Sequence, residues 1–224
     1  MNEPHAVMAT RLDGPRVAPA SGGAAMSLVI LVHGYGSNGA DLIGLVPYWR
    51  SALPDTAFVA PNAPERVVGA PDGYQWWGFG GADRAAGARG AAAILDAFID
   101  AELASHDLTE ASLALVGFSQ GTMLSLYVGP RRERQLAGIL GYSGMLVDEA
   151  GLAAEIKTRP PVLLIHGDAD PMVPVTAFHT ARDALTRLGF PLATHVSPGL
   201  GHSIDMPGLQ LGERFLRQVL KAGA

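Results

Sequence analysis

Residues 113–126 read LALVGFSQGTMLSL: an apolar run, a Gly-x-Ser-x-Gly pentapeptide and a run compatible with a helix. A strand, this pentapeptide and a helix, in that order, place the serine on a sharp turn with its hydroxyl above the end of a sheet. The pattern needs Gly117 and Gly121, because a Cβ atom two residues to either side of Ser119 would collide with the neighbouring strand or helix. The stretch therefore predicts a reactive serine at the end of a buried strand.

Short apolar runs and helical patterns alternate along the rest of the chain. Besides residues 113–116, the predicted strands are Ser27–Val32, Ala57–Ala60, Gly138–Tyr142, Val162–His166 and Ala193–Ser197. Several of them are apolar without alternation, as expected of strands covered on both faces. Apolar stripes with helical spacing run over Leu95–Leu103, Phe178–Leu188 and Leu211–Leu220. This order predicts an α/β protein with a mostly parallel sheet and helices on both faces.

The chain is predicted to be a single domain over residues 1–224, because its length suits one domain and no repeat or linker divides it. Residues 1–15 are expected to be a loose N-terminal lead-in, with at most an edge strand before residue 27. Pro64–Gly90 is rich in glycine and alanine and has no clear period. We expect it to be a long surface excursion, of the kind that often carries function.

The composition argues against several classes of partner. The net charge is −5, and the only basic cluster, Arg131–Arg134, contains an acid and is typical of a solvated loop or helix end, so nucleic-acid binding is not expected. The chain has no cysteine, which excludes disulfides, thiolate metal sites and a cysteine nucleophile. No signal peptide and no apolar run of ~20 residues is found, so stable membrane insertion is not expected and a cytoplasmic location is predicted.

A serine nucleophile needs a base, and the base needs an acid that orients it. In this type of fold the three follow in the order serine, acid, histidine, at the ends of successive strands. Asp168 and Asp170 both follow the predicted strand that starts at Val162. We favour Asp170, which lies in the turn before Pro171 and can reach a neighbouring loop, whereas Asp168 is suited to bracing the turn.

His202 is the predicted base, because it follows the last predicted strand and precedes the last predicted helix. The alternative is a loop histidine without chemistry. The remaining histidines lack the chain order that a triad base needs. Two of them, His33 and His166, each precede a glycine at a strand end and are expected to form structural hydrogen bonds. The others are His5, His106, His179 and His195.

An acyl-transfer site also needs backbone N–H groups that stabilise the oxyanion, and each of these is worth ~3 kcal/mol or more. The N–H of Gln120, at the start of the helix after the serine, is the first predicted donor. The second is the N–H of Tyr35, in the glycine-rich loop that follows Ser27–Val32. The alternative for this loop is a turn that merely caps a helix starting near Asp41.

Five motifs in this order resemble the phospholipase/carboxylesterase family of α/β-hydrolases, which includes the acyl-protein thioesterases. They are His33–Gly36, Ala60–Pro64, Gly117–Gly121, the run His166–Pro174 and Gly201-His202. The resemblance implies an α/β-hydrolase fold and hydrolysis of carboxylic esters, with some members acting on thioesters or lysophospholipids. It implies Ser119 as nucleophile, Asp170 as acid, His202 as base, and Tyr35 and Gln120 in the oxyanion hole, without a metal or cofactor.

The resemblance also bears on the substrate pocket. Trp76-Trp77 is similar to a family stretch near the acyl pocket, in which a second aromatic residue follows a tryptophan. Between the strands Gly138–Tyr142 and Val162–His166 there is room for about one helix, Glu149–Lys157, so no large lid domain is expected and the site should be open. The residues predicted to line the pocket are Trp76, Trp77, Met145, Met172 and Val173.

The sequence thus predicts a serine carboxylesterase that cleaves a small-molecule ester, with short to medium acyl chains, through an acyl-enzyme. An acyl-thioesterase or a lysophospholipase on the same triad is the alternative. A peptidase, a lactone hydrolase and a non-catalytic binding protein are weaker readings, since a binding protein usually has a broken triad. A homodimer would fit the general frequency of two-fold assemblies.

Overall fold

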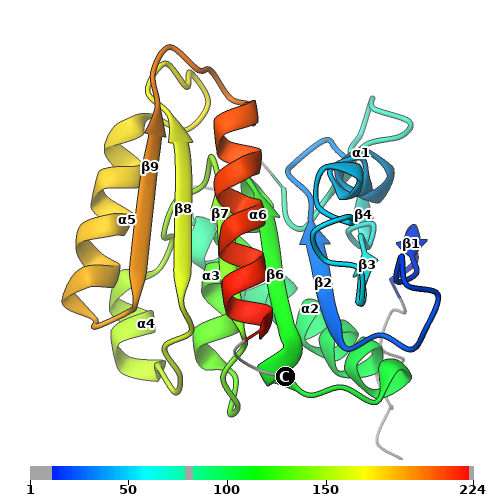
Figure 1. Cartoon of the computed structure of the whole chain (residues 1–224). Helices are drawn as coiled ribbons and strands as arrows, with labels where there is room; N and C mark the ends of the chain where they lie inside the picture. Colours follow the sequence, from blue (N-terminus) through cyan, green and yellow to red (C-terminus); the bar gives the residue numbers. More distant parts are fainter. Residues whose placement is uncertain (1–11, 79–82, 222–224) are drawn as a thin grey trace, which may run out of the picture.

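The computed structural model describes residues 12–78 and 83–221 and is built around one seven-stranded sheet, in the order β1-β3-β2-β6-β7-β8-β9 (Figure 1). Only β1 is antiparallel to its neighbour, and every other neighbouring pair is parallel. The strands are β1 (Arg16–Val17), β2 (Ser27–Val32), β3 (Thr56–Val59), β6 (Leu113–Phe118), β7 (Gly138–Tyr142), β8 (Val162–Gly167) and β9 (Leu192–Ser197). The predicted α/β fold with a mostly parallel sheet is confirmed.

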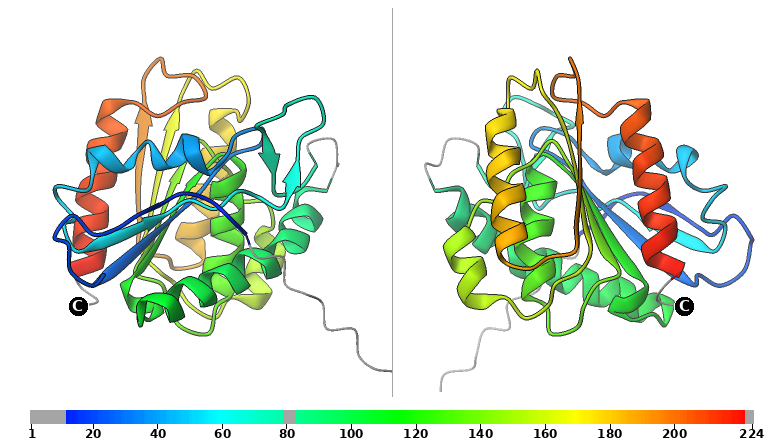
Figure 2. Two further views of the ribbon diagram at one scale, coloured as in Figure 1. Left: turned by 90° about the vertical axis from the view of Figure 1, so that its right-hand side faces the viewer. Right: turned by 60° about the vertical axis from the view of Figure 1, so that its left-hand side comes forward.

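Helices cover both faces of this sheet (Figure 2). They are α1 (Gly39–Ile43), α2 (Arg84–His106), α3 (Gln120–Val128), α4 (Glu149–Glu155), α5 (Val175–Arg187) and α6 (Met206–Lys221), with the 3₁₀ helices η1 (Val46–Tyr48), η2 (Glu110–Ser112) and η3 (Gly129–Arg131). Because strand side chains alternate between the faces, neighbouring residues of β2 belong to different cores. Ile30 lies in the core under α2 to α5, whereas Leu31 lies in the core under α1, η1 and α6.

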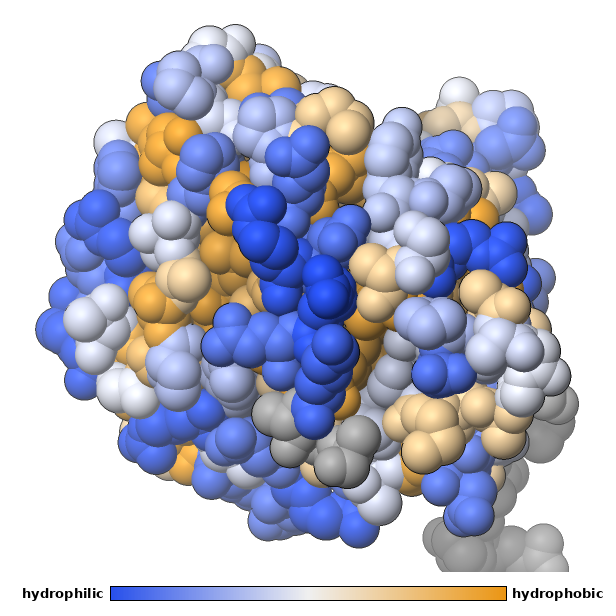
Figure 3. All heavy atoms as spheres, viewed as in Figure 1, coloured by the Kyte–Doolittle hydropathy of each residue, from blue (hydrophilic) through white to orange (hydrophobic). Residues whose placement is uncertain are grey.

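The last helix, α6, shows the amphipathic pattern most plainly. Its residues Leu209, Leu216 and Leu220 are buried against the sheet, and it turns a hydrophilic face outward (Figure 3). No helix within residues 12–78 and 83–221 is long and apolar enough to cross a membrane. Between β7 and β8 the only helix is the short α4, which agrees with the expected absence of a large lid.

One expectation about loops needs correction. The segment Pro64–Gly90 is not one irregular excursion, since it contains the hairpin β4 (Glu65–Arg66) and β5 (Tyr74–Gln75), and α2 begins at Arg84. The first turns of α2 are too rich in alanine and glycine to show an apolar stripe, which is why periodicity missed them. The predicted lead-in lies mostly outside the described residues; where description begins, Leu12 is already buried, and β1 forms the expected edge strand.

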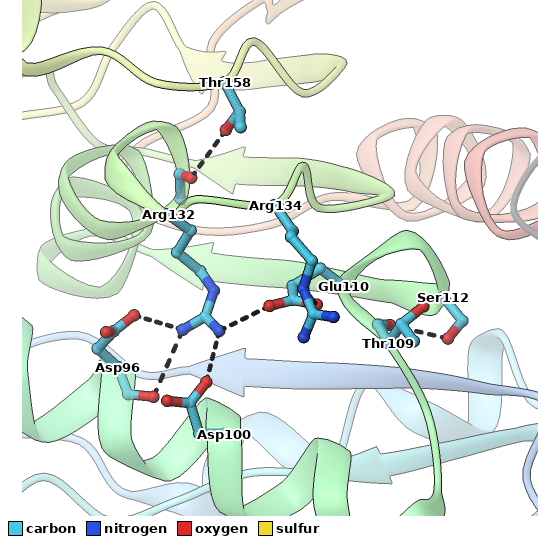
Figure 4. A network of polar contacts seen from close by, with 9 residues as sticks. Asp96, Asp100, Thr109, Glu110, Ser112, Arg132, Arg134 and Thr158 are labelled. Atoms are coloured by element: carbon cyan, nitrogen blue, oxygen red, sulfur yellow. Dashed lines mark hydrogen bonds and ion pairs between the residues drawn. The ribbon is translucent and has the colours of Figure 1, made fainter.

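One buried arginine ties α2 to the amino end of the sheet, where the strands begin (Figure 4). The guanidinium of Arg132 pairs with Asp96 and, at 2.5 Å, with Asp100, both on α2. Its Nη2 atom also lies 3.1 Å from Oε1 of Glu110, in η2 just before β6. The second carboxylate oxygen of Glu110 pairs with Arg134 at 2.7 Å. The network joins α2 and η2 to the segment of Arg132 and Arg134 that precedes β7.

Candidate active site

Ser119 lies on the turn between β6 and α3, in a backbone conformation that few residues other than glycine adopt. Its φ is 53° and its ψ is −114°. Such a residue costs of order 1–3 kcal/mol and persists only where its surroundings hold it. Here the Ser119 N–H donates to the carbonyl of Tyr142 on β7 at 2.9 Å, and Thr122 Oγ1 donates to the same carbonyl at 2.8 Å. The turn is therefore fixed against the neighbouring strand.

The two glycines of the pentapeptide are required by close backbone contacts. A Cβ atom on Gly117 would lie 2.4 Å from the amide nitrogen of Thr122, and one on Gly121 would lie 1.8 Å from the carbonyl oxygen of Val32. Both distances are far below van der Waals contact, and the atoms involved are backbone. The collision expected from the sequence is thus present on both sides, with the following helix and with β2.

Asp170 and His202 meet above the carboxyl ends of β8 and β9. Asp170 Oδ2 lies 2.7 Å from His202 Nδ1, and Asp170 Oδ1 accepts hydrogen bonds from the N–H groups of Met172 and Val173 at 2.8 and 2.9 Å. Burial would raise the pKa of Asp170, but the bonds from His202, Val173 and Met172 outweigh it and hold that pKa below its usual value. Because Nδ1 faces a carboxylate, it carries the proton of a neutral His202, and Nε2 is left as the acceptor.

Asp168, the other candidate acid, faces a different partner. Its Oδ1 accepts a hydrogen bond from the Gly199 N–H at 2.6 Å and so braces the turn after β9. His166 supports the Asp170 loop from below, since its Nε2 lies 2.8 Å from the Val173 carbonyl and 3.5 Å from Asp170 Oδ2. Of the two aspartates, only Asp170 contacts His202.

Ser119 and His202 line the same cavity of about 250 Å³ at this end of the sheet. The His202 ring packs on Phe118, the neighbour of Ser119, with ring centroids 4.9 Å apart. The other lining residues are Tyr35, Trp77, Arg84, Gln120, Met123, Met145, Met172, Val173 and Pro174. A serine, a histidine held by a carboxylate and a largely apolar wall thus line one cavity.

The glycine-rich loop after β2 passes directly over the serine. A Cβ atom on Gly34 would lie 3.2 Å from the Ser119 Cβ, and Tyr35 lines the cavity. The loop also caps α1, because the Asn38 side chain accepts from the Asp41 N–H at 2.9 Å. The capping role and the proximity to Ser119 therefore coexist, although they were alternatives in the sequence.

His33 fixes the start of this loop. Its Nε2 accepts from the Ala63 N–H at 2.9 Å, so its proton lies on Nδ1, which donates to the Gly34 carbonyl at 2.7 Å. Burial lowers the pKa of His33, although the bond to Gly34 opposes this, so the ring is neutral at pH 7. His33 and His166 both form the hydrogen bonds to backbone that the sequence predicted.

Of the two adjacent tryptophans, only Trp77 lines the cavity. Trp76 is buried in the core, where its Nε1 donates to the His33 carbonyl at 3.0 Å. Trp76 therefore lies outside the cavity lining that was expected of it, because its side chain is buried in the core. Met145, Met172 and Val173 line the cavity as expected.

The side chain of Gln120 has a role that the sequence reasoning missed. Its Oε1 accepts from the Trp76 N–H and its Nε2 donates to the Trp77 carbonyl, each at 2.9 Å. The residue expected to supply an oxyanion N–H thus also clamps the segment that forms one cavity wall. Met123, Arg84 and Pro174 line the cavity but were not predicted. Met123 could have been predicted from its place one helical turn after Ser119, whereas nothing in the sequence marks Arg84 or Pro174.

A mostly parallel sheet with a serine on the turn after a central strand, and an aspartate and a histidine after later strands, defines an α/β-hydrolase. The chain belongs to the phospholipase/carboxylesterase family, whose profile matches residues 14–220. As a member of that family it is an ester-hydrolysing serine hydrolase.

Similar proteins carry both ester and thioester names. Acyl-protein thioesterase 1 of Gibberella zeae is 30% identical over 212 residues, which cover 86% of this chain and 90% of the relative. Esterase YpfH of Escherichia coli is 26% identical over 199 residues, which cover 88% and 84%. Among solved structures, the crystal structure of esterase PE8 superposes with a TM-score of 0.89 and its sequence is 47% identical. The match covers 94% of this chain and 100% of that one. These names do not decide whether the protein cleaves oxygen esters, which release an alcohol, or thioesters, which release a thiol.

Proposed function

We propose that the protein is a carboxylesterase that hydrolyses short to medium acyl esters through an acyl-enzyme on Ser119. The observation that supports this most strongly is the 2.7 Å contact between Asp170 and His202, in the cavity that Ser119 also lines. A serine at its ordinary pKa needs such an oriented base, and the order of the three residues along the chain is the one found in this fold.

In the first stage, Ser119 Oγ attacks the ester carbonyl carbon while Nε2 of His202 takes the hydroxyl proton. The carbonyl electron pair moves onto oxygen, where the N–H groups of Gln120 and Tyr35 stabilise it as the proposed oxyanion donors. When the tetrahedral intermediate collapses, His202 returns the proton to the departing alcohol. Asp170 stays ionised throughout, and its lowered pKa suits that task.

In the second stage, water repeats the reaction on the acyl-enzyme. His202 Nε2 takes a proton from the water as it attacks, and the same donors hold the second oxyanion. Collapse releases the carboxylic acid and restores the Ser119 hydroxyl with the proton from His202. The Ser119 backbone is already held at a positive φ by its bond to Tyr142, so little reorganisation is needed between the stages.

An acyl-thioesterase is the second candidate, and the names of several relatives favour it. The same residues would act, with His202 returning the proton to a departing thiol in place of the alcohol. A matched pair of butyryl esters, one oxygen ester and one thioester, measured as kcat/KM would rank the two. A cytoplasmic location and a homodimer stay predictions of the sequence.

Labelling by a fluorophosphonate probe tests the nucleophile directly. We expect the wild-type protein to be labelled and the Ser119→Ala variant to escape labelling. Ser125→Ala is the matched control, since Ser125 lies on the same helix with its hydroxyl bonded to the Gly121 carbonyl at 2.8 Å, and labelling should persist. Labelling of a folded Ser119→Ala protein would refute the proposal, and no labelling of the wild type would favour a binding protein.

A further inference from the structure

The indole of Trp77 lies directly on the backbone of α2, at Gly87. A Cβ atom on Gly87 would lie 2.5 Å from both Cγ and Cδ1 of Trp77 and 3.0 Å from its Cβ. No side chain tolerates such distances, so glycine is the one residue that leaves the indole where it is. Because Trp77 lines the cavity, Gly87 supports a cavity wall from behind.

The backbone of Trp77 has little freedom to retreat from such a contact. The Gln120 side chain holds the Trp77 carbonyl and the Trp76 N–H at 2.9 Å, and the buried Trp76 ring is bonded to the His33 carbonyl. A Cβ atom at position 87 would therefore act on the indole through its two side-chain torsions alone. Trp77 lines the cavity and also packs against the apolar core, so a displaced indole changes the shape of the cavity wall.

Another part of the cavity lining is adaptable. Met123, Met145 and Met172 also line the cavity, and methionine side chains rearrange around different shapes at small cost. Trp77 is a rigid plane by comparison. The size limit of the cavity should therefore be set where the wall cannot yield, at the indole and the helix behind it.

Glycine inside a helix normally weakens it, by about 1 kcal/mol relative to alanine. The first turns of α2 contain both Gly87 and Gly90, and a Cβ atom on Gly90 would meet nothing within 4 Å. Both glycines thus weaken the helix to the same extent, but only at Gly87 would a side chain collide with a neighbour. Gly90 provides an internal comparison for any test of Gly87.

We infer that Gly87 is a specificity-determining residue, which sets the largest acyl chain that the cavity accepts by giving the Trp77 indole a recess in α2. The inference rests on the proposed ester hydrolysis. It predicts that esters with long unbranched apolar acyl groups are affected by this wall. Acetyl esters should be affected little, because a short acyl group leaves the far part of the cavity empty.

The test compares p-nitrophenyl acetate with p-nitrophenyl octanoate as the ratio of their kcat/KM values. In Gly87→Ala the octanoate-to-acetate ratio should fall by about 10-fold or more, the scale on which a pocket resolves one or a few methylenes. In Gly90→Ala the ratio should stay within about 2-fold of the wild type. In Trp77→Leu it should rise, and adding Gly87→Ala to Trp77→Leu should leave it unchanged, because the colliding ring is gone.

Several outcomes would overturn the inference. One is an equal ratio in Gly87→Ala and Gly90→Ala, and another is a further fall when Gly87→Ala is added to Trp77→Leu. If Gly87→Ala fails to fold, an unchanged octanoate-to-acetate ratio in Trp77→Leu alone would also overturn the inference. Failure of the proposed function looks different, since the wild type would then hydrolyse neither ester and escape the fluorophosphonate probe.

Discussion

At the carboxyl end of the sheet the cavity measures about 250 Å³ and is lined by Ser119 and His202, whereas a hollow of about 590 Å³ at the amino end is lined by neither. The larger hollow lies among the starts of β7, β8 and β9 and the end of α6, with apolar residues such as Leu136, Val162 and Phe215. Since every neighbouring strand pair apart from β1 is parallel, the loops that follow strands all meet at one end. The direction of the strands, and not the volume of a hollow, therefore decides at which end of the sheet Ser119 and His202 lie.

The charged groups at the two ends are also arranged for different tasks. At the amino end, Arg132 is surrounded by Asp96, Asp100 and Glu110, and Arg134 pairs with Glu110 as well, so these charged groups form one network of ion pairs. At the carboxyl end, Asp170 holds only Nδ1 of His202, which leaves the other ring nitrogen for the cavity. The first arrangement holds segments of the chain together, whereas the second suits the base role proposed for His202.

The largest effect is expected when Ser119, the proposed nucleophile, is replaced. We expect Ser119→Ala to lower kcat for p-nitrophenyl butyrate by about 10⁴-fold or more, the scale seen when a triad serine is lost. Its melting temperature should stay close to that of the wild type, because alanine keeps the same backbone bonds. Steady-state kinetics and thermal unfolding measure the two quantities. Substantial turnover by the purified variant would move the reaction away from this serine.

The two aspartates after β8 give the next largest contrast. Asp170→Asn should lower kcat by roughly 10³–10⁴-fold, because an amide favours the wrong tautomer of His202. Asp168→Asn should change kcat by less than about 10-fold, since the Asp168 side chain accepts from the Gly199 N–H and an amide oxygen can still accept that bond. The reverse ranking would make Asp168 the triad acid.

Much of this architecture follows from local sequence. The pentapeptide glycines are required by contacts with Thr122, just after the turn, and with Val32 on the neighbouring strand β2, and the strands are marked by apolar runs. The choice between Asp168 and Asp170 followed from turn position, and only Asp170 contacts His202. Such features depend on neighbours close in the chain or on the fixed order of a parallel sheet.

The cavity walls depend instead on contacts that the sequence does not encode locally. From the sequence, either Trp76 or Trp77 could have faced the cavity, since the contact of Trp76 with His33 joins residues that are far apart in the chain. The Gln120 clamp and the recess at Gly87 join α2, α3 and the chain after β5. Pattern reasoning has no access to such three-way contacts.

At the amino end a variant should affect stability without affecting chemistry. Arg132→Met would leave Glu110 as a buried carboxylate with only the exposed Arg134 beside it. Removing one partner of a buried pair typically costs about 3–5 kcal/mol, so chemical unfolding should show a loss of that order. Adding Glu110→Gln should recover part of it. The kcat of the folded variant should match the wild type, and a large fall in kcat would mean that the two ends are coupled.

Acidification should expose smaller contributions from both ends. Burial would raise the pKa of Glu110, but its hydrogen bonds, including those from Arg132 and Arg134, outweigh this and lower that pKa, as happens for Asp170 at the other end. A carboxyl whose folded pKa is lowered stabilises the fold above its unfolded value, about 4, and loses this contribution as the pH falls through the folded value. The difference in melting temperature between the wild type and Glu110→Gln, and likewise Asp170→Asn, should therefore be largest near pH 7 and shrink towards pH 3. A difference that widens on acidification would contradict the ion pairing assigned to that end.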